Sequence, residues 1–138
     1  MISIQVVDKT QRIKPALMNV KADVFFSNDE IQALNSIEQM KPSVVMLNYD
    51  FCKDQTTEYI TLILQVSSKS KVIVVVDKLS HRKIIKCLIA GAQGYQDINK
   101  LELYANKLVH VVVAGEAWVS RHILALILDK LRVEYIKG

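Results

Sequence analysis

The chain has 138 residues, of which 51% are hydrophobic and 23% are charged, and its formal net charge is +4. This length predicts one domain, and the balance of residue types, with only 4 glycines and 2 prolines, excludes a disordered, collagen-like or low-complexity chain. Both cysteines stand apart from any CxxC pair or neighbouring histidine, so the sequence supports neither a disulfide scaffold nor a zinc site.

Apolar segments with the pattern of strands alternate with amphipathic, helical segments along the chain. This alternation is typical of a parallel sheet with helices on both faces. Pro15 shortens or bends the first helical segment, and Pro42 ends the second. The predicted strands cover residues 2–7, 23–26, 44–47, 72–76 and 94–97, and the helical segments cover residues 10–20, 27–40, 57–66, 80–90 and 101–114.

Local signals support several of these boundaries. Ser27 and Glu30 have the S-x-x-E spacing of a capping box at the start of the second helix. Ser80 is suited to cap the fourth helix, and Gly91 is suited to stop it. Residues 72–76 are β-formers without interruption, so we expect this segment to be a central strand of the sheet.

A sixth helix is predicted after Gly115, from about residue 120 to residue 135. Its apolar positions cover more than one stripe, so we expect it to pack on the domain with one side and on a second copy or a further domain with the other. Packing wholly within one domain is the alternative, and helix 101–114 is the second candidate surface. The residues expected at a dimer interface are Ile123, Leu124, Ile127, Leu128 and Leu131.

The apolar runs are short. The longest, residues 72–76 and 123–128, are far below the roughly 20 residues that span a bilayer, and the N-terminus has no basic-then-apolar leader pattern. We therefore expect a cytoplasmic protein without membrane contact. One loose basic cluster is interpreted as a solvated helix face, with a DNA-binding patch as the alternative: Lys78, His81, Arg82, Lys83 and Lys86.

The order of elements matches the flavodoxin-like (CheY-like) doubly wound α/β fold, a five-stranded parallel sheet of order 2-1-3-4-5, here with an extra C-terminal helix. Two segments narrow this fold: residues 91–95 (GAQGY) and residues 115–121 (GEAWVSR). Together, at this separation, they resemble the receiver domains of LuxR-type (NarL/FixJ) response regulators of two-component signal transduction. In those receivers GAxGY enters the fifth strand and GExW-[LVF]-[ST]-R leads out of the fifth helix. The resemblance covers the whole chain and implies a receiver-like domain over residues 1–138.

The resemblance also identifies the positions at which a receiver takes up phosphate. Receivers carry two acidic residues after the first strand, a phosphoryl-accepting aspartate after the third, a hydroxyl residue at the end of the fourth and a lysine at the end of the fifth. In this chain only the first of these positions keeps its residue type. The matching residues are Asp8, Lys9, Asn48, Val76 and Ile98.

The chemistry of phosphoryl uptake explains why these losses matter. A carboxylate is the nucleophile, further carboxylates hold Mg²⁺, and a hydroxyl and a lysine stabilise the phosphoryl oxygens. The amide of Asn48 is not a competent nucleophile, and Lys9 beside Asp8 can neutralise the remaining acid. Asp50 lies too far along the chain to replace Asn48, and Asp77 belongs to the following loop. We therefore predict a receiver that takes no phosphate, needs no metal or cofactor and is not an enzyme.

Another ligand could replace phosphate as the input. The segment Trp118, Val119, Ser120 and Arg121 resembles the W-[FLM]-[TS]-R motif of a subgroup of LuxR-type biofilm regulators, which bind cyclic di-GMP at a receiver dimer interface. The resemblance implies that Arg121 stacks on a guanine and that Ser120 contacts a phosphate. In the alternative, Ser120 caps the sixth helix and Trp118 packs in the core. Val119 departs from the second position of the motif.

We therefore interpret the chain as a non-phosphorylatable receiver of a LuxR-type transcriptional regulator, a homodimeric signalling and dimerisation module. DNA contact would require a helix-turn-helix domain, which these 138 residues do not contain. Two alternatives stay open. One is a cyclic di-GMP-binding receiver that controls a biofilm-type regulator, and the other is a stand-alone receiver-like module that binds another protein.

Overall fold

The computed structural model describes residues 1–137. Its centre is a five-stranded parallel sheet in the order β2-β1-β3-β4-β5, which confirms the predicted fold class and strand order. The middle strand is β3, buried at every residue, and β4, which was predicted to be a central strand, lies between β3 and β5 and is buried over residues 72–76. The strands are β1 (Ser3–Val7), β2 (Asp23–Ser27), β3 (Val44–Asn48), β4 (Lys71–Val76) and β5 (Gly94–Asp97).

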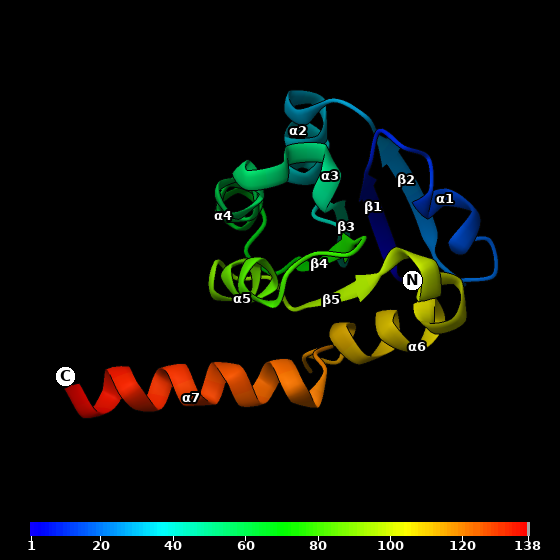
Figure 1. Cartoon of the computed structure of the whole chain (residues 1–138). Helices are drawn as coiled ribbons and strands as arrows, with labels where there is room; N and C mark the ends of the chain where they lie inside the picture. Colours follow the sequence, from blue (N-terminus) through cyan, green and yellow to red (C-terminus); the bar gives the residue numbers. More distant parts are fainter. Residues whose placement is uncertain (138) are drawn as a thin grey trace.

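Helices connect the strands and cover both faces of the sheet (Figure 1). The extra C-terminal helix is present. The helices are α1 (Ile13–Ala16), α2 (Glu30–Met40), α3 (Tyr49–Cys52), α4 (Thr56–Val66), α5 (His81–Ile89), α6 (Leu101–Val113) and α7 (Arg121–Lys137), with 3-10 turns η1 (Lys53–Gln55) and η2 (Ile98–Lys100).

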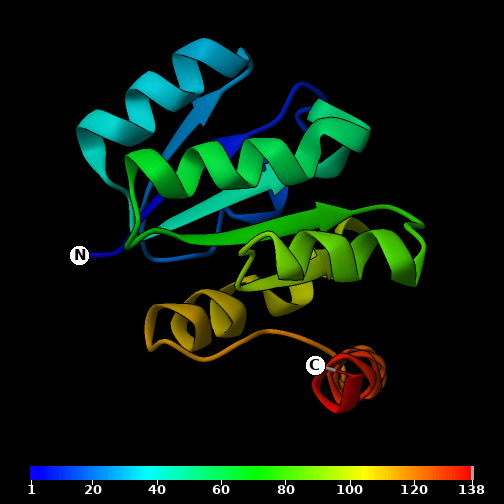
Figure 2. The ribbon, with the colours of Figure 1, turned by 90° about the vertical axis from the view of Figure 1, so that its left-hand side faces the viewer.

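The sheet separates two apolar clusters because successive strand residues point to opposite faces. Val45 and Leu47 of β3 pack in the cluster under α2, α3, α4 and α5, whereas Val44 and Met46 pack in the cluster under α1 and α6. Figure 2 shows the two helical layers on either side of the sheet, with α7 lying outside both. This arrangement brings the carboxyl ends of all five strands to one edge.

The first helix is much shorter than predicted. Residues 10–20 were expected to be helical, but α1 is a single turn. The amide groups of Thr10 and Ile13 donate to the side chain of Asp8, and Gln11 has a φ of 61°, so the backbone before α1 follows the Asp8 carboxylate instead of a helix.

The predicted cap of α2 was also wrong, whereas the predicted ends of α5 are confirmed. Ser27 ends β2, and its Oγ accepts a 2.7 Å hydrogen bond from Gln5 Nε2; Asp29 caps α2 instead. Ser80 Oγ accepts from the amide of Lys83 at the start of α5. Gly91, just after α5, has a φ of 122°, which explains a glycine there.

Helix α7 touches the domain only through its first turns. Ile123 is 1% exposed, and α7 packs on α5. Beyond these turns the helix runs away from the sheet and its covering helices (Figure 1). Within residues 1–137, no helix combines the length and the apolar character that crossing a membrane requires.

Candidate functional site

The candidate site lies at the carboxyl edge of the sheet, where the structure brings together the positions matched to a phosphorylation pocket. Asp8 directly follows β1, and Asn48 is the last residue of β3. Val76 is the last residue of β4, and Ile98 directly follows β5. The parallel register of these strands sets the four side chains at neighbouring strand ends.

Asp8 is satisfied within the chain. Its Oδ1 accepts from Asn48 Nδ2 at 2.9 Å, and from the amide and the hydroxyl of Thr10 at 2.9 and 2.8 Å. Its Oδ2 accepts from the amide of Ile13 at 3.3 Å. The residue is 8% exposed, so donors from the protein occupy the oxygens that a divalent cation would need.

Asn48 is chemically matched to this carboxylate. Its NH₂ group donates to Asp8, while its Oδ1 accepts from the amide of Asp50 at 3.0 Å and so caps α3. An aspartate here would place a second carboxylate against the first. The amide of Asn48 is therefore a buried hydrogen-bond partner of Asp8.

Lys9 does not neutralise Asp8, contrary to the sequence-based expectation. Its Nζ lies 4.8 Å from the ring centroid of Phe51, which is a cation–π arrangement. The charge of Asp8 is instead stabilised by the hydrogen bonds from Asn48, Thr10 and the amide of Ile13.

The two remaining positions are apolar and belong to the core. Val76 is 4% exposed and Ile98 is 9% exposed, and neither side chain can donate a hydrogen bond. The residues at this edge therefore do not fit the Mg²⁺ ion and the phosphoryl group of a phosphorylatable receiver. Within residues 1–137, no three His, Cys, Asp or Glu side chains come together as a metal-binding group.

Arg12, like Thr10, lies at this edge and was not identified from the sequence. It comes from the loop between β1 and α1, and its Nη1 donates to Asp77 Oδ2 at 2.8 Å. Its Nη2 donates to Asn99 Oδ1 at 3.3 Å, just after β5. Asp77 follows β4 in a loop, as predicted, and the hydrogen bond from Arg12 lowers the pKa of its carboxyl group. A lone arginine in a loop carries no sequence signal for such a contact.

The two segments that suggested the receiver resemblance contact each other. The chain before α7 lies along the free edge of β5, where the amide of Trp118 donates to Gln93 O and the amide of Tyr95 donates to Trp118 O. The indole Nε1 of Trp118 donates to Gln96 Oε1 at 2.9 Å. Gly94 makes this possible, because a Cβ there would lie 2.4 Å from the carbonyl oxygen of Trp118.

Ser120 caps α7, as the alternative interpretation predicted, and Trp118 is partly buried against the apolar cluster under α1 and α6. Ser120 Oγ accepts from the amide of Ile123 at 3.2 Å, which caps α7, and from the hydroxyl of Tyr95 at 2.9 Å. Arg121 is exposed at the first turn of α7. Beside this segment lies an open groove of about 490 Å³ whose lining includes Tyr95, Lys100 and the Trp118–Ser120 stretch.

The proposed dimer residues fall into two groups. Ile123 is buried in the chain's own domain and Ile127 is partly buried, so Ile123 is unavailable to a partner. Leu124, Leu128 and Leu131 are 50%, 41% and 54% exposed. Of the five residues predicted for a dimer interface on α7, only these three leucines are therefore exposed.

The cysteines of the structure are free and buried. Burial raises the pKa of the Cys52 thiol and of the Cys87 thiol to about 11 each. Neither thiol is poised as a nucleophile at neutral pH.

Solved structures share this fold, although no protein-family model and no curated protein sequence matches the chain. A LuxR-family two-component response regulator from Aurantimonas sp. SI85-9A1 gives a TM-score of 0.75 at 17% identity, over 95% of this chain and 97% of that one. The apo REC domain of RcsB from Salmonella enterica serovar Typhimurium gives 0.80 at 12% identity, over 94% and 99%. A response regulator from Thermotoga maritima gives 0.67 at 21% identity, over 80% and 98%. The chain thus has the fold of response regulator receiver domains.

Proposed function

We propose that the chain is a receiver-type signalling domain of a LuxR-type transcriptional regulator that does not take phosphate. The observation that carries this proposal is the buried hydrogen bond between Asn48 Nδ2 and Asp8 Oδ1. In this bond, the amide at the position matched to the phosphoryl-accepting aspartate donates to Asp8, the one matched position that keeps its acid. Such a domain acts in the cytoplasm through its surfaces and binds DNA only through a separate domain.

Contacts within the chain hold the carboxyl edge of the sheet in one conformation without phosphate. Asn48 and Thr10 bind Asp8, which fixes the ends of β1 and β3 relative to each other. Val76 and Ile98 pack in the two core clusters and fix the ends of β4 and β5 by apolar burial. The edge is thus closed by hydrogen bonds and packing that persist independently of a phosphodonor.

A phosphodonor experiment tests this function. Incubation of the full chain with acetyl phosphate and Mg²⁺, followed by intact mass measurement, should give no phosphorylated species. A phosphorylatable receiver treated in parallel provides the positive control. A stable acyl phosphate on any aspartate of this edge would contradict the proposal.

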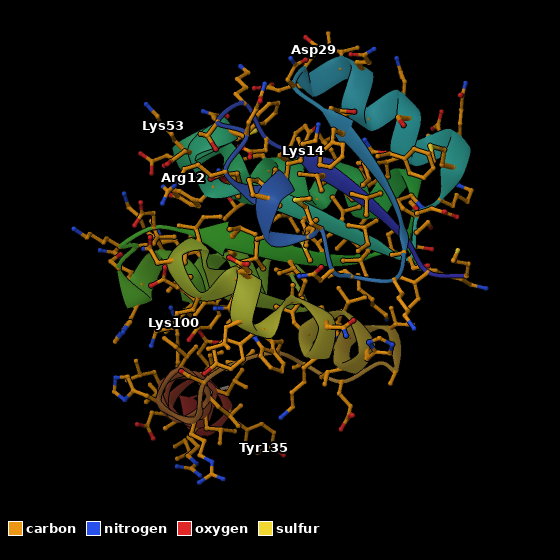
Figure 3. All side chains as sticks on the ribbon, turned by 90° about the vertical axis from the view of Figure 1, so that its right-hand side faces the viewer. Arg12, Lys14, Asp29, Lys53, Lys100 and Tyr135 are labelled. Carbon is orange, nitrogen blue, oxygen red and sulfur yellow. The ribbon has the colours of Figure 1, made fainter. Side chains whose placement is uncertain are left out.

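The same domain is proposed to form a homodimer through α7. Leu124, Leu128, Leu131 and Tyr135 follow one another at spacings of four, three and four residues, which is the a/d pattern of a two-helix seam. All four are exposed in the single chain. Figure 3, which looks along α7, shows Tyr135 on this helix, outside the sheet and its covering helices. A second copy of the helix presents the same stripe and so is the partner this pattern fits.

Charged substitutions on this stripe should produce a folded monomer. In Leu124→Glu/Leu128→Glu, each chain would have to bury two carboxylates at the seam. The free energy of burying these charges exceeds the free energy gained by pairing the helices. Light scattering after gel filtration measures the oligomeric state. Leu103→Glu on α6, at a leucine that is 75% exposed, is the matched control for the second candidate surface. A dimer that survives the α7 changes but is lost in Leu103→Glu would place the interface on α6.

The groove beside residues 118–120 favours one second candidate, binding of cyclic di-GMP. Its lining offers aromatic side chains at Tyr95 and Trp118 and a cation at Lys100, with Arg121 exposed nearby. Aromatic faces and cations are suited to stacking on guanine and to pairing with phosphate. Titration calorimetry with cyclic di-GMP should show saturable heat that Arg121→Ala abolishes. Absence of heat at high protein concentration would leave Trp118 and Ser120 with their structural roles alone.

A further inference from the structure

Arg12 links three separate segments at the carboxyl edge of the sheet. Its guanidinium leaves the β1–α1 loop and donates to Asp77 after β4 and to Asn99 after β5. Asn99 Nδ2 in turn donates to Asp77 Oδ1 at 3.4 Å, which closes a triangle of side chains. In Figure 3, Arg12 lies between Lys53 and Lys100 along the side of the molecule where the strands end.

The surrounding charges favour a cation at this point. Asp77 contacts Arg12 directly, and Asp50 and Asp8 add attractive fields, so the pKa of Arg12 is raised. A guanidinium with a fixed fork can reach an acid and an amide at once, which a lysine ammonium does with less geometric definition. The guanidinium of Arg12 therefore supplies the positive charge beside these acidic residues.

One of the segments that Arg12 joins leads directly to α5, and α5 packs on α7. Asp77 begins the short loop that ends at Ser80, the cap of α5. The first residue of α5, His81, has its ring centroid 5.0 Å from that of His122 in the first turn of α7. A loop held by Arg12 thus fixes the start of α5, against which α7 begins.

We propose that Arg12 is a tethered cation that ties the ends of β1, β4 and β5 together and so holds the start of α5 and α7 in one arrangement without phosphate or metal. The inference rests on the proposed function and adds the device that keeps the domain in a single state. It assigns to a side chain the linking of strand ends that a bound phosphoryl group would otherwise provide.

The size of the effect follows from the exposure of the pair. The side chains of Arg12 and Asp77 are 44% and 32% exposed, so solvent screens this ion pair and its contribution to stability is small. Loss of the tie should therefore leave the chain folded and raise local opening about threefold, without global unfolding.

Amide hydrogen exchange on the full chain tests the tie. In Arg12→Gln, the amides of Ile84 and Leu124, which donate to the carbonyl groups of Ser80 and Ser120, should exchange about threefold faster at neutral pH. The amide of Lys41 at the end of α2 should be unchanged. Lys14→Gln is the matched control, because it removes a positive charge two residues from Arg12 whose Nζ lies over the ring of Phe26.

A second variant separates the tie from a simple loss of positive charge. Asp77→Asn keeps Arg12 but removes its ionic partner, so it should speed exchange of the same amides. Equal exchange in Arg12→Gln and the original chain would overturn the tie, as would equal acceleration in Lys14→Gln. Neither result would affect the phosphodonor experiment, since that outcome depends on Asp8 and Asn48.

Discussion

Replacement of Gly94 by alanine should release the segment that precedes α7 from the edge of β5. The added Cβ would lie 2.4 Å from the carbonyl oxygen of Trp118 and 2.8 Å from its Cβ, so the segment has to move. Movement breaks the two backbone hydrogen bonds that Trp118 makes with Gln93 and Tyr95. We expect a loss of about 3 kcal/mol in the free energy of unfolding, as for overpacking combined with lost hydrogen bonds. Urea unfolding measures this loss, and the fluorescence of Trp118 reports the displaced segment.

Gly115→Ala provides the comparison for this prediction. Gly115 has a φ of 94°, but a Cβ there meets nothing within 4 Å, so only the backbone conformation is penalised. A loss of about 1 kcal/mol and unchanged fluorescence are expected. If Gly94→Ala were no more destabilising than Gly115→Ala, the contact between residue 94 and the Trp118 segment would not hold α7 in place.

Asn48→Asp should destabilise the chain and should not restore phosphate uptake. The new carboxylate would face Asp8 across the 2.9 Å contact that Asn48 Nδ2 now makes, and both residues are more than nine-tenths buried. An uncompensated buried charge costs about 3 kcal/mol at neutral pH. Restoring the acid does not restore the missing hydroxyl and lysine, because Val76 and Ile98 stay apolar.

The stability of Asn48→Asp should depend on pH. Two adjacent carboxylates share a proton, so the folded variant has one carboxyl pKa raised above its unfolded value. Its stability should be closest to that of the original chain in acid and should fall as the pH rises through that raised pKa. Unfolding in EDTA at about pH 5 and about pH 8 measures the change. The exchanged pair, Asp8→Asn/Asn48→Asp, should recover most of the loss; equal stability of all three chains at the higher pH would contradict the pairing.

Much of the fold could be predicted because it depends on local patterns. The run at residues 72–76 and the cap at Ser80 correspond to β4 and to the start of α5. Those signals are short-range. The first helix was predicted too long, since its start depends on Asp8 accepting the amides of Thr10 and Ile13. The cap of α2 was misplaced because Ser27 Oγ is taken by Gln5 on a neighbouring strand.

The sequence predicted which residues lie at the candidate site but not which side chains contact each other there. The resemblance to receiver domains identified Asp8 and Asn48, and the parallel register of β1 and β3 explains why they meet. Their hydrogen bond depends on the orientation of the Asn48 side-chain amide in the buried pocket. The position of the Lys9 ammonium group depends on the ring of Phe51, which follows β3. The contact of Arg12 with Asp77 spans 65 positions of the chain and has no local signal. Side-chain pairing across loops requires the coordinates.

Amide NMR with beryllofluoride and Mg²⁺ tests the central claim most directly, because this phosphoryl analogue binds only where an acid, a cation site and oxygen-stabilising groups coincide. The account predicts unchanged chemical shifts for the amides of Asp8, Thr10, Asn48 and Asp50 at saturating reagent. Saturable shifts of these amides, absent with either component alone, would show a working pocket and contradict the account.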